Sequence, residues 1–353
     1  SRCIGLSRVT ISPNLTFIGK YAFNGCNLLE KVVIPESVKE IGNNAFCGCT
    51  SLKEIALPPS ISIGECAFSR CALVEIKLPE SINGLPVSVF EGCESLRKVV
   101  FEATLQSIGK SAFKGCSSLC QIVGPGIPEA AEGEISIPSL KVLGENSFEG
   151  CQSISKFTIS SNLSSTSRGC FKGCSSVKEF VVPDSISSIA DESFMDCVAL
   201  KKINVPTVLT DLGKSAFENC KSMSEVDLKI SSNAFKDAVF KDCSSLEHIE
   251  IPANVKKIGK STFENCRKLI KIFASEPIES IGNFGFKNCE SLVEIPASAP
   301  ISSIGEEGFS GCSSLRTLTM TSSISVGSSA FYNCSSLTSV TVPSTIKSSA
   351  KLI

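Results

Sequence analysis

Cysteine is the residue type that offers this chain the most chemistry. The 353 residues include 19 cysteines but a single histidine, His248, two tyrosines and no tryptophan. Cysteine thiolates can bind zinc, form disulfides or act as nucleophiles, and a zinc site needs four converging ligands that often come from closely spaced pairs. The closest pairs in the sequence are Cys47 and Cys49, Cys66 and Cys71, Cys116 and Cys120, and Cys170 and Cys174.

The cysteines follow a repeat rather than the spacing of a metal site. Fourteen Phe-x-x-Cys motifs lie at intervals of 22 or 23 residues, apart from one interval of 35 residues. Each short pair contains one cysteine of this repeat, so we expect no metal site and no bound cofactor. We call the repeated residues the cysteine column: Cys26, Cys49, Cys71, Cys93, Cys116, Cys151, Cys174, Cys197, Cys220, Cys243, Cys266, Cys289, Cys312 and Cys334, with Cys3 in a truncated unit before them.

The column is expected to hold buried free thiols. A residue that recurs once per repeat occupies one column of a stack, where a thiol packs as a small apolar group and donates weakly to backbone carbonyls. Stacked Cα–Cβ vectors run parallel, which disfavours disulfides. Cys47, Cys66 and Cys120 lie outside the column and are expected to be exposed, with a Cys47–Cys66 disulfide as an alternative, whereas Cys170 is expected to point inward.

The repeating unit predicts a solenoid. In residues 243–266, Ile249 and Ile251 alternate with polar residues, which indicates a strand with one buried face, and Pro252 ends it. The Gly-x-x-Ala-Phe-x-x-Cys stretch is typical of a tight helical or 3₁₀ turn. One unit cannot bury its apolar face alone, but stacked units can. We therefore predict a single repeat domain, residues 1–353, of about 15 coils with one parallel sheet and a stacked phenylalanine spine.

Several segments carry a family resemblance. They are Phe-Lys-Gly-Cys-Ser-Ser-Leu (113–119), Phe-Lys-Gly-Cys-Ser-Ser-Val (171–177), Ile-Glu-Ile-Pro (249–252), Val-Thr-Val-Pro (340–343) and Ile-Gly-Lys-Ser-Ala-Phe (108–113). The unit resembles the leucine-rich repeat of the BspA-like, or Treponema pallidum-type, class. The resemblance implies a right-handed, curved leucine-rich-repeat array with one parallel β-sheet and short turns or 3₁₀ segments on the opposite side. It also implies surface proteins of mucosal bacteria and protist parasites, many of them adhesins, some binding host matrix proteins such as fibronectin and fibrinogen.

Composition excludes several classes of function. The formal net charge is −1, from 34 basic and 35 acidic residues, which removes the long-range field that nucleic-acid binding uses. No apolar run approaches the roughly 20 residues that span a bilayer, so no membrane insertion is expected. No phosphate loop or nucleophile motif occurs, and His248 stands on a flat strand row beside Glu225 and Lys271, so we predict no enzyme.

Two rows of residues point outward from the predicted strands. Five positions after each cysteine, opposite charges follow one another from coil to coil, which predicts a ladder of ion pairs; a polar recognition strip is the alternative. Seven positions after each cysteine, the first half of the row is apolar and the centre acidic. The strand face is the usual docking surface of such a solenoid. Its candidate partner-binding residues are Val33, Val100, Val123, Lys156, Val181, Lys202, Asp227, His248, Glu250 and Phe273.

The repeat departs from its pattern in three places. The 35-residue interval holds an inserted loop at about residues 124–137, rich in glycine, proline and glutamate. Thr166-Ser167 and Phe235-Lys236 replace the usual Ile-Gly pair and are expected to bend the array locally.

We therefore predict a non-catalytic protein–protein interaction module at the cell surface or secreted, an adhesin or a receptor- or host-matrix-binding protein that uses its strand face. An intracellular scaffold that assembles partner proteins is the alternative, because many free thiols suit a reducing compartment. The sequence opens at the cysteine of a coil and has no initiator methionine, which suggests a fragment whose uncapped end coils self-associate end to end.

Overall fold

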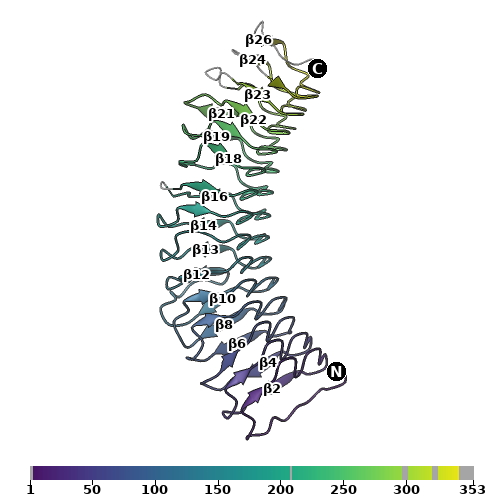
Figure 1. The fold of residues 1–353 in the computed structure, drawn as a ribbon, viewed down its shortest axis with the longest axis vertical. Helices are drawn as coiled ribbons and strands as arrows, with labels where there is room; N and C mark the ends of the chain where they lie inside the picture. The colour runs from purple at the N-terminus through teal and green to yellow at the C-terminus, as the bar shows by residue number, and fades with distance from the viewer. Residues whose placement is uncertain (1–2, 207–208, 296–300, 320–324, 342–353) are drawn as a thin grey trace. The chain divides into compact units, whose positions relative to one another are not determined.

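The computed structural model describes residues 3–206, 209–295, 301–319 and 325–341, and this part of the chain is built of short strands and turns without a helix. The chain forms two compact units. Unit 1 comprises residues 1–163 and 167–181, and unit 2 comprises residues 164–166 and 182–353. Within each unit, successive coils lie side by side and contribute strands of the same direction (Figure 1).

The predicted strand recurs at the same place in the coils and forms a wide ladder. Exposed and buried residues alternate along it, as in His248–Ile251, where the two isoleucines point inward. Partners lie one coil apart in parallel register, for example Lys31 with Glu54. In unit 1 these strands are β2 (Lys31–Val33), β4 (Glu54–Ala56), β6 (Glu75–Leu78), β8 (Lys98–Phe101), β10 (Gln121–Val123), β11 (Glu134–Ser136), β13 (Lys156–Thr158) and β14 (Glu179–Val181). In unit 2 they are β16 (Lys202–Ile203), β19 (His248–Ile251), β21 (Lys271–Ala274), β24 (Thr317–Thr319) and β26 (Ser339–Thr341).

A second, narrow ladder of two-residue strands was not among the expectations from sequence. It is formed by the apolar residue of the Ile-Gly motif and the residue before it, and the pairing is again parallel. In unit 1 it comprises β1 (Phe17–Ile18), β3 (Glu40–Ile41), β5 (Ser62–Ile63), β7 (Gly84–Leu85), β9 (Ser107–Ile108) and β12 (Val142–Leu143). In unit 2 it comprises β15 (Ser188–Ile189), β17 (Asp211–Leu212), β18 (Ala234–Phe235), β20 (Lys257–Ile258), β22 (Ser280–Ile281), β23 (Ser303–Ile304) and β25 (Ser325–Val326).

Phenylalanine and cysteine of the Phe-x-x-Cys motif form the core. The phenylalanine rings stack from coil to coil, with centroids 5.1 Å apart for Phe23 and Phe46 and 5.5 Å apart for Phe194 and Phe217. Along the described column from Cys49 to Cys334, twelve thiols donate to the phenylalanine carbonyl of the preceding coil, at 3.0–3.2 Å. That carbonyl also accepts the backbone N–H of its own coil's cysteine. The thiol therefore binds one coil to the next.

The motif itself is a succession of β-turns rather than a 3₁₀ helix. In the first coil, Ala22, Asn24 and Cys26 donate backbone N–H groups to carbonyls three residues earlier. Tyr21 and Gly25 have φ angles of 60° and 72°, whereas a 3₁₀ helix needs negative φ throughout. The residue before the column cysteine repeats this left-handed conformation and is glycine, asparagine or aspartate in most coils, the residue types that tolerate it best.

A glycine that follows most of the narrow strands sets how closely neighbouring coils approach. A Cβ atom on Gly282 would lie 2.8 Å from the backbone of the preceding coil. The glycine N–H donates at 2.8–3.0 Å to the carbonyl of the narrow strand one coil earlier. The glycines in this position are Gly42, Gly64, Gly109, Gly144, Gly213, Gly259, Gly282, Gly305 and Gly327, and the narrow ladder is continuous at each of them.

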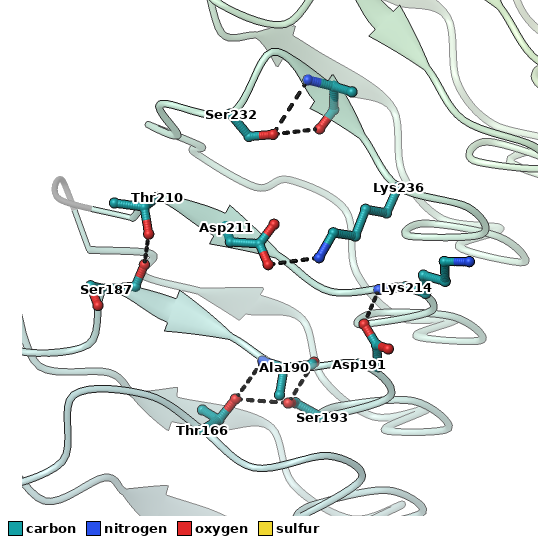
Figure 2. Close-up of polar contacts among 11 residues, drawn as sticks. Thr166, Ser187, Ala190, Asp191, Ser193, Thr210, Asp211, Lys214, Ser232 and Lys236 are labelled. Carbon is teal, nitrogen blue, oxygen red and sulfur yellow. Dashed lines mark hydrogen bonds and ion pairs between the residues drawn. The ribbon is translucent and has the colours of Figure 1, made fainter.

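The narrow ladder is interrupted where this glycine is replaced. Pro86 has no N–H, and no pairing joins β5 to β7 among the described strands. Lys236 occupies the position after β18, no pairing joins β17 to β18, and its Nζ instead lies 2.6 Å from Asp211 Oδ2 (Figure 2). Where Phe235-Lys236 replaces the usual Ile-Gly pair, the backbone pairing with the preceding coil is lost and a side-chain ion pair takes its place.

The departure at Thr166 is compensated by buried hydroxyl groups. Figure 2 shows the Thr166 hydroxyl accepting the backbone N–H of Ala190 at 2.9 Å and contacting the Ser193 hydroxyl at 2.8 Å. Ser193 Oγ in turn donates to the Ala190 carbonyl at 2.7 Å. Because a buried hydroxyl without a partner is costly, these bonds let a polar residue stand where other coils bury isoleucine.

We predict that Gly282→Ala destabilises the chain by about 1–3 kcal/mol, because the added Cβ forces two backbones apart. Urea unfolding followed by circular dichroism measures the change. Gly5→Ala is the matched control, since a Cβ at Gly5 meets no atom within 4 Å. Equal midpoints for Gly282→Ala and the parent chain would show that the close approach is not a constraint.

We predict that stability falls steeply above pH 9. Burial raises the pKa of the Cys93 thiol to about 12 and that of Cys334 to about 11, from an ordinary value of 9.0. As the pH rises, a thiol loses its proton in the unfolded chain before it does so in the folded chain. Between the unfolded and folded pKa values of a buried thiol, the free energy of unfolding therefore falls by up to about 1.4 kcal/mol per pH unit. Urea midpoints at pH 7 to 11 in reducing buffer measure the slope. Cys243→Ala, which removes one such thiol, should give a shallower slope; an unchanged slope would contradict the mechanism.

Candidate functional site

The charged row of the strand face consists of ion pairs between neighbouring coils. In unit 1, Lys31–Glu54, Lys98–Glu75 and Lys156–Glu179 are 2.7, 3.7 and 3.4 Å apart. In unit 2, Lys202–Glu225 and Lys271–Glu294 are 2.8 and 3.3 Å apart. The pairs are exposed, and each contributes no more than about 1 kcal/mol. The candidate residues Lys156 and Lys202 are therefore engaged within the chain.

The valines of the second outward row do not form one continuous patch. Val33 and Val181 are 60% and 38% exposed, whereas Val100 and Val123 are half-buried and lie in register with each other. Ser136 of the inserted strand β11 and Thr158 of β13 lie between Val123 and Val181, because the row runs Ser136, Thr158, Val181 in register. The apolar half of this row is thus divided by two polar residues.

In unit 2 the same row places an aromatic ring next to acidic groups. Phe273 of β21 is 48% exposed and lies in register with Glu250 of β19. The Lys271 Nζ lies 5.3 Å from the centroid of the Phe273 ring, and the His248 ring centroid lies 6.1 Å from it. Around Phe273 the surface forms a shallow depression of about 390 Å³, lined also by Glu250, Lys271 and Glu294.

His248 lies on the exposed face of β19, and its register neighbour is Lys271. Within the described ranges, no group of three or more histidine, cysteine, aspartate or glutamate side chains is placed to hold a metal ion. What the face offers is an aromatic side chain, carboxylates and an imidazole on a rigid parallel ladder.

The inserted segment adds a strand as well as a loop. Residues 134–136 form β11, which pairs with β13, so the loop ends earlier than the expected residue 137. The Gly133 N–H donates to the Cys120 carbonyl at 2.9 Å, which returns the chain to the strand face. The insertion thus adds one strand, β11, to the wide ladder, and Glu134 of this strand lies in register with Lys156.

The loop covers Cys120, which was expected to be exposed. Cys120 is 5% exposed, and its thiol donates to Glu132 Oε1 at 3.2 Å. The same carboxylate oxygen lies 2.5 Å from Arg97 Nη2. Burial, together with the hydrogen bond to Glu132, raises the pKa of the Cys120 thiol. The buried position of Cys120 could not be predicted from the sequence, because it depends on the inserted loop folding back over its own coil.

The other cysteines outside the column differ in how deeply they are buried. Cys170 is fully buried, as its position in the repeat predicts. Cys47 and Cys66 are half-buried and are both free, so the alternative of a disulfide between them is not realised in this structure. Burial raises the pKa of the Cys66 thiol, with a smaller contribution from Cys47.

The coil geometry agrees with a known family of repeats. The model of the BspA-type leucine-rich repeat region matches residues 1–62, 60–126, 132–247 and 233–351. The chain belongs to the BspA-type leucine-rich repeat family. Leucine-rich repeats of this kind are typically protein-interaction modules and are generally non-catalytic. A comparison with functionally curated proteins gave no match.

Solved structures share this leucine-rich repeat fold. A leucine-rich repeat protein from Bacteroides ovatus is 25% identical, with 92% of this chain and 82% of that chain covered and a TM-score of 0.64. A leucine-rich cell surface protein from Faecalibacterium prausnitzii is 23% identical, with 95% and 86% covered and a TM-score of 0.51. The pneumococcal vaccine antigen PcpA is 20% identical, with 96% and 88% covered and a TM-score of 0.61.

Within the described residues, no helix has the length and apolar character needed to cross a membrane.

The ion pair between Arg97 and Glu132 was not predicted from the sequence. They lie 35 residues apart, and only the unusual length of that one interval signalled that a segment could fold back.

We predict that Glu132→Ala increases the alkylation rate of Cys120 at least tenfold, because it removes the group that holds the loop over the thiol. N-ethylmaleimide labelling followed by peptide mass spectrometry measures each cysteine separately. Glu129→Ala, on the exposed part of the same loop, is the control and should leave Cys120 protected. Labelling of Cys120 in the parent chain as fast as that of exposed Cys3 would contradict the covered position.

Proposed function

We propose that this leucine-rich repeat chain is an adhesin or receptor-binding protein whose strand face docks a protein ligand. The observation that carries the proposal is Phe273, a large aromatic side chain that is half exposed on a rigid strand and adjoins a depression. Exposed aromatic residues on otherwise charged surfaces are common anchors of protein interfaces. Val33 and Val181 provide further apolar positions on the strand face of unit 1.

The proposed location is the cell surface or the extracellular medium. One solved relative is named a cell surface protein and another a vaccine antigen, and their likeness to this chain is one of fold. The alternative, an intracellular scaffold, is favoured by one observation: the exposed thiol of Cys3 and the half-buried thiols of Cys47 and Cys66 are all free. Free accessible thiols persist best in a reducing compartment.

The location is tested by labelling intact source cells with a membrane-impermeant amine reagent. Labelling of the chain on intact cells supports the surface proposal. Labelling that appears only after lysis overturns it and favours the scaffold.

We predict that Phe273→Ala weakens binding to a protein ligand at least tenfold, which corresponds to about 1.4 kcal/mol. Immobilised fibronectin and fibrinogen, the ligands that the family resemblance suggests, are the first probes. Val142→Ala is the control, because Val142 is 56% exposed on the narrow ladder, away from the strand face. Equal affinities of the two variants and of Val181→Lys would show that a ligand binds elsewhere.

A further inference from the structure

Both ladders of unit 1 are interrupted at the same junction between two coils. On one side of it, the wide ladder joins β2 to β4 and the narrow ladder joins β3 to β5. On the other side, the wide ladder joins β6 to β8 and the narrow ladder joins β7 to β9. Among the described strands, no pairing joins β4 to β6 or β5 to β7. The backbones of the two coils are therefore not joined by either ladder at this junction.

Little else holds the strand side of this junction together. Val74, directly before β6, donates its N–H to the Lys53 carbonyl at 3.4 Å. At the same position one coil earlier and one coil later, the N–H groups of Lys53 and Arg97 donate to the preceding coil at 2.9 and 2.8 Å. No ion pair between described side chains crosses the junction, since the acids of β4 and β6 pair with lysines on its outer sides.

Two residues explain how the narrow ladder stops here. Pro86 occupies the place of the glycine whose N–H donates to the preceding coil elsewhere, and proline has no N–H to give. Ser81 supplies a partial replacement, because its hydroxyl accepts the Ile61 N–H at 3.1 Å and donates to the Ile61 carbonyl at 2.9 Å. A side chain thus makes bonds that the backbone makes in other coils.

The length of the repeat does not by itself remove the pairing. The repeat that ends at Phe90 has 22 residues, one fewer than most. The repeat from Phe309 to Phe331 also has 22 residues, yet β23 and β25 pair across it. The missing donor at Pro86 is therefore the difference that a single substitution can reverse.

The turn side of the same junction is fully joined. The N–H groups of Cys66, Phe68 and Arg70 donate to carbonyls of the next coil at 2.9, 3.1 and 2.7 Å. The Cys93 thiol donates to the Phe68 carbonyl at 3.0 Å, as in the rest of the cysteine column. The rings of Phe68 and Phe90 remain stacked, with centroids 6.0 Å apart.

We infer that this junction is a hinge of unit 1, which opens on its strand side while its turn side stays joined. In a stacked array each coil is held by its neighbours, so the junction with the fewest bonds opens at the lowest free energy. The strand face of unit 1 then consists of two rigid segments, β2–β4 and β6–β8–β10, whose relative angle changes at the hinge. Neither the hinge nor its test depends on what the strand face binds.

Amide hydrogen exchange of the full chain, resolved to single residues by mass spectrometry with electron-transfer fragmentation, tests both sides of the hinge. We predict a protection factor for the Val74 amide at least tenfold below those of Lys53 and Arg97, because opening breaks its bond. On the turn side, the Phe68 amide should be protected as well as the Phe46 amide, which donates to the next coil in the same way.

Two variants change the strand side in opposite directions. Pro86→Gly supplies the missing donor and should raise the protection of Val74 at least threefold. Ser81→Ala removes both hydroxyl bonds and should lower it. The matched controls are Pro128→Gly on the exposed part of the inserted loop and Ser95→Ala, which removes an exposed hydroxyl; both should leave Val74 unchanged.

Equal protection of Val74 and Arg97 in the parent chain overturns the hinge, as does a Pro86→Gly variant that exchanges like Pro128→Gly. Low protection of both Val74 and Phe68 also overturns it, since the two coils would then separate completely instead of turning about a joined side. The docking function is unaffected by each of these outcomes, because no ligand takes part in the measurement.

Discussion

The phenylalanine carbonyl of each coil is the point on which the stacking of this protein depends. It accepts the N–H of its own cysteine and the thiol of the next coil, as Phe90 does from Cys93 and Cys116. One acceptor thus closes a turn and holds the neighbouring coil at a fixed distance. The stacked rings, the parallel ladders and the close glycine contacts all require that distance, because each is formed between coils rather than within one.

The periodic part of this arrangement could be read from the sequence. The Phe-x-x-Cys spacing is sufficient to place Cys243 and Phe263 inside, because a residue that recurs at one phase of a stack keeps one environment. The alternation of Ile249 and Ile251 likewise gives the strand and its exposed face. The charged row follows from the same register, since Lys31 and Glu54 become neighbours once the coils are stacked.

The features that could not be predicted from the sequence arise from segments whose pattern is too short or too irregular to recognise. The narrow ladder has only two residues per coil, too few for an alternation to appear, although Gly42 and its equivalents signal it through their close packing. Cys120 was misplaced because a loop of irregular sequence folds back over it through Glu132. The surface at Phe273 was identified by position, but the depression beside it depends on side-chain conformations that only the structure shows.

The charged positions repeat over a longer distance than the core. Phenylalanine and cysteine recur in every coil, but in the row that contains Glu218 the sign of the charge alternates through Lys241, Glu264 and Lys287, so in this row a like charge returns only after two coils. Loss or duplication of a single coil would therefore preserve the interior while bringing like charges together on the surface. Gain or loss of two coils at a time preserves both. Where the charges alternate in this way, the array can change its length most easily in steps of two repeats.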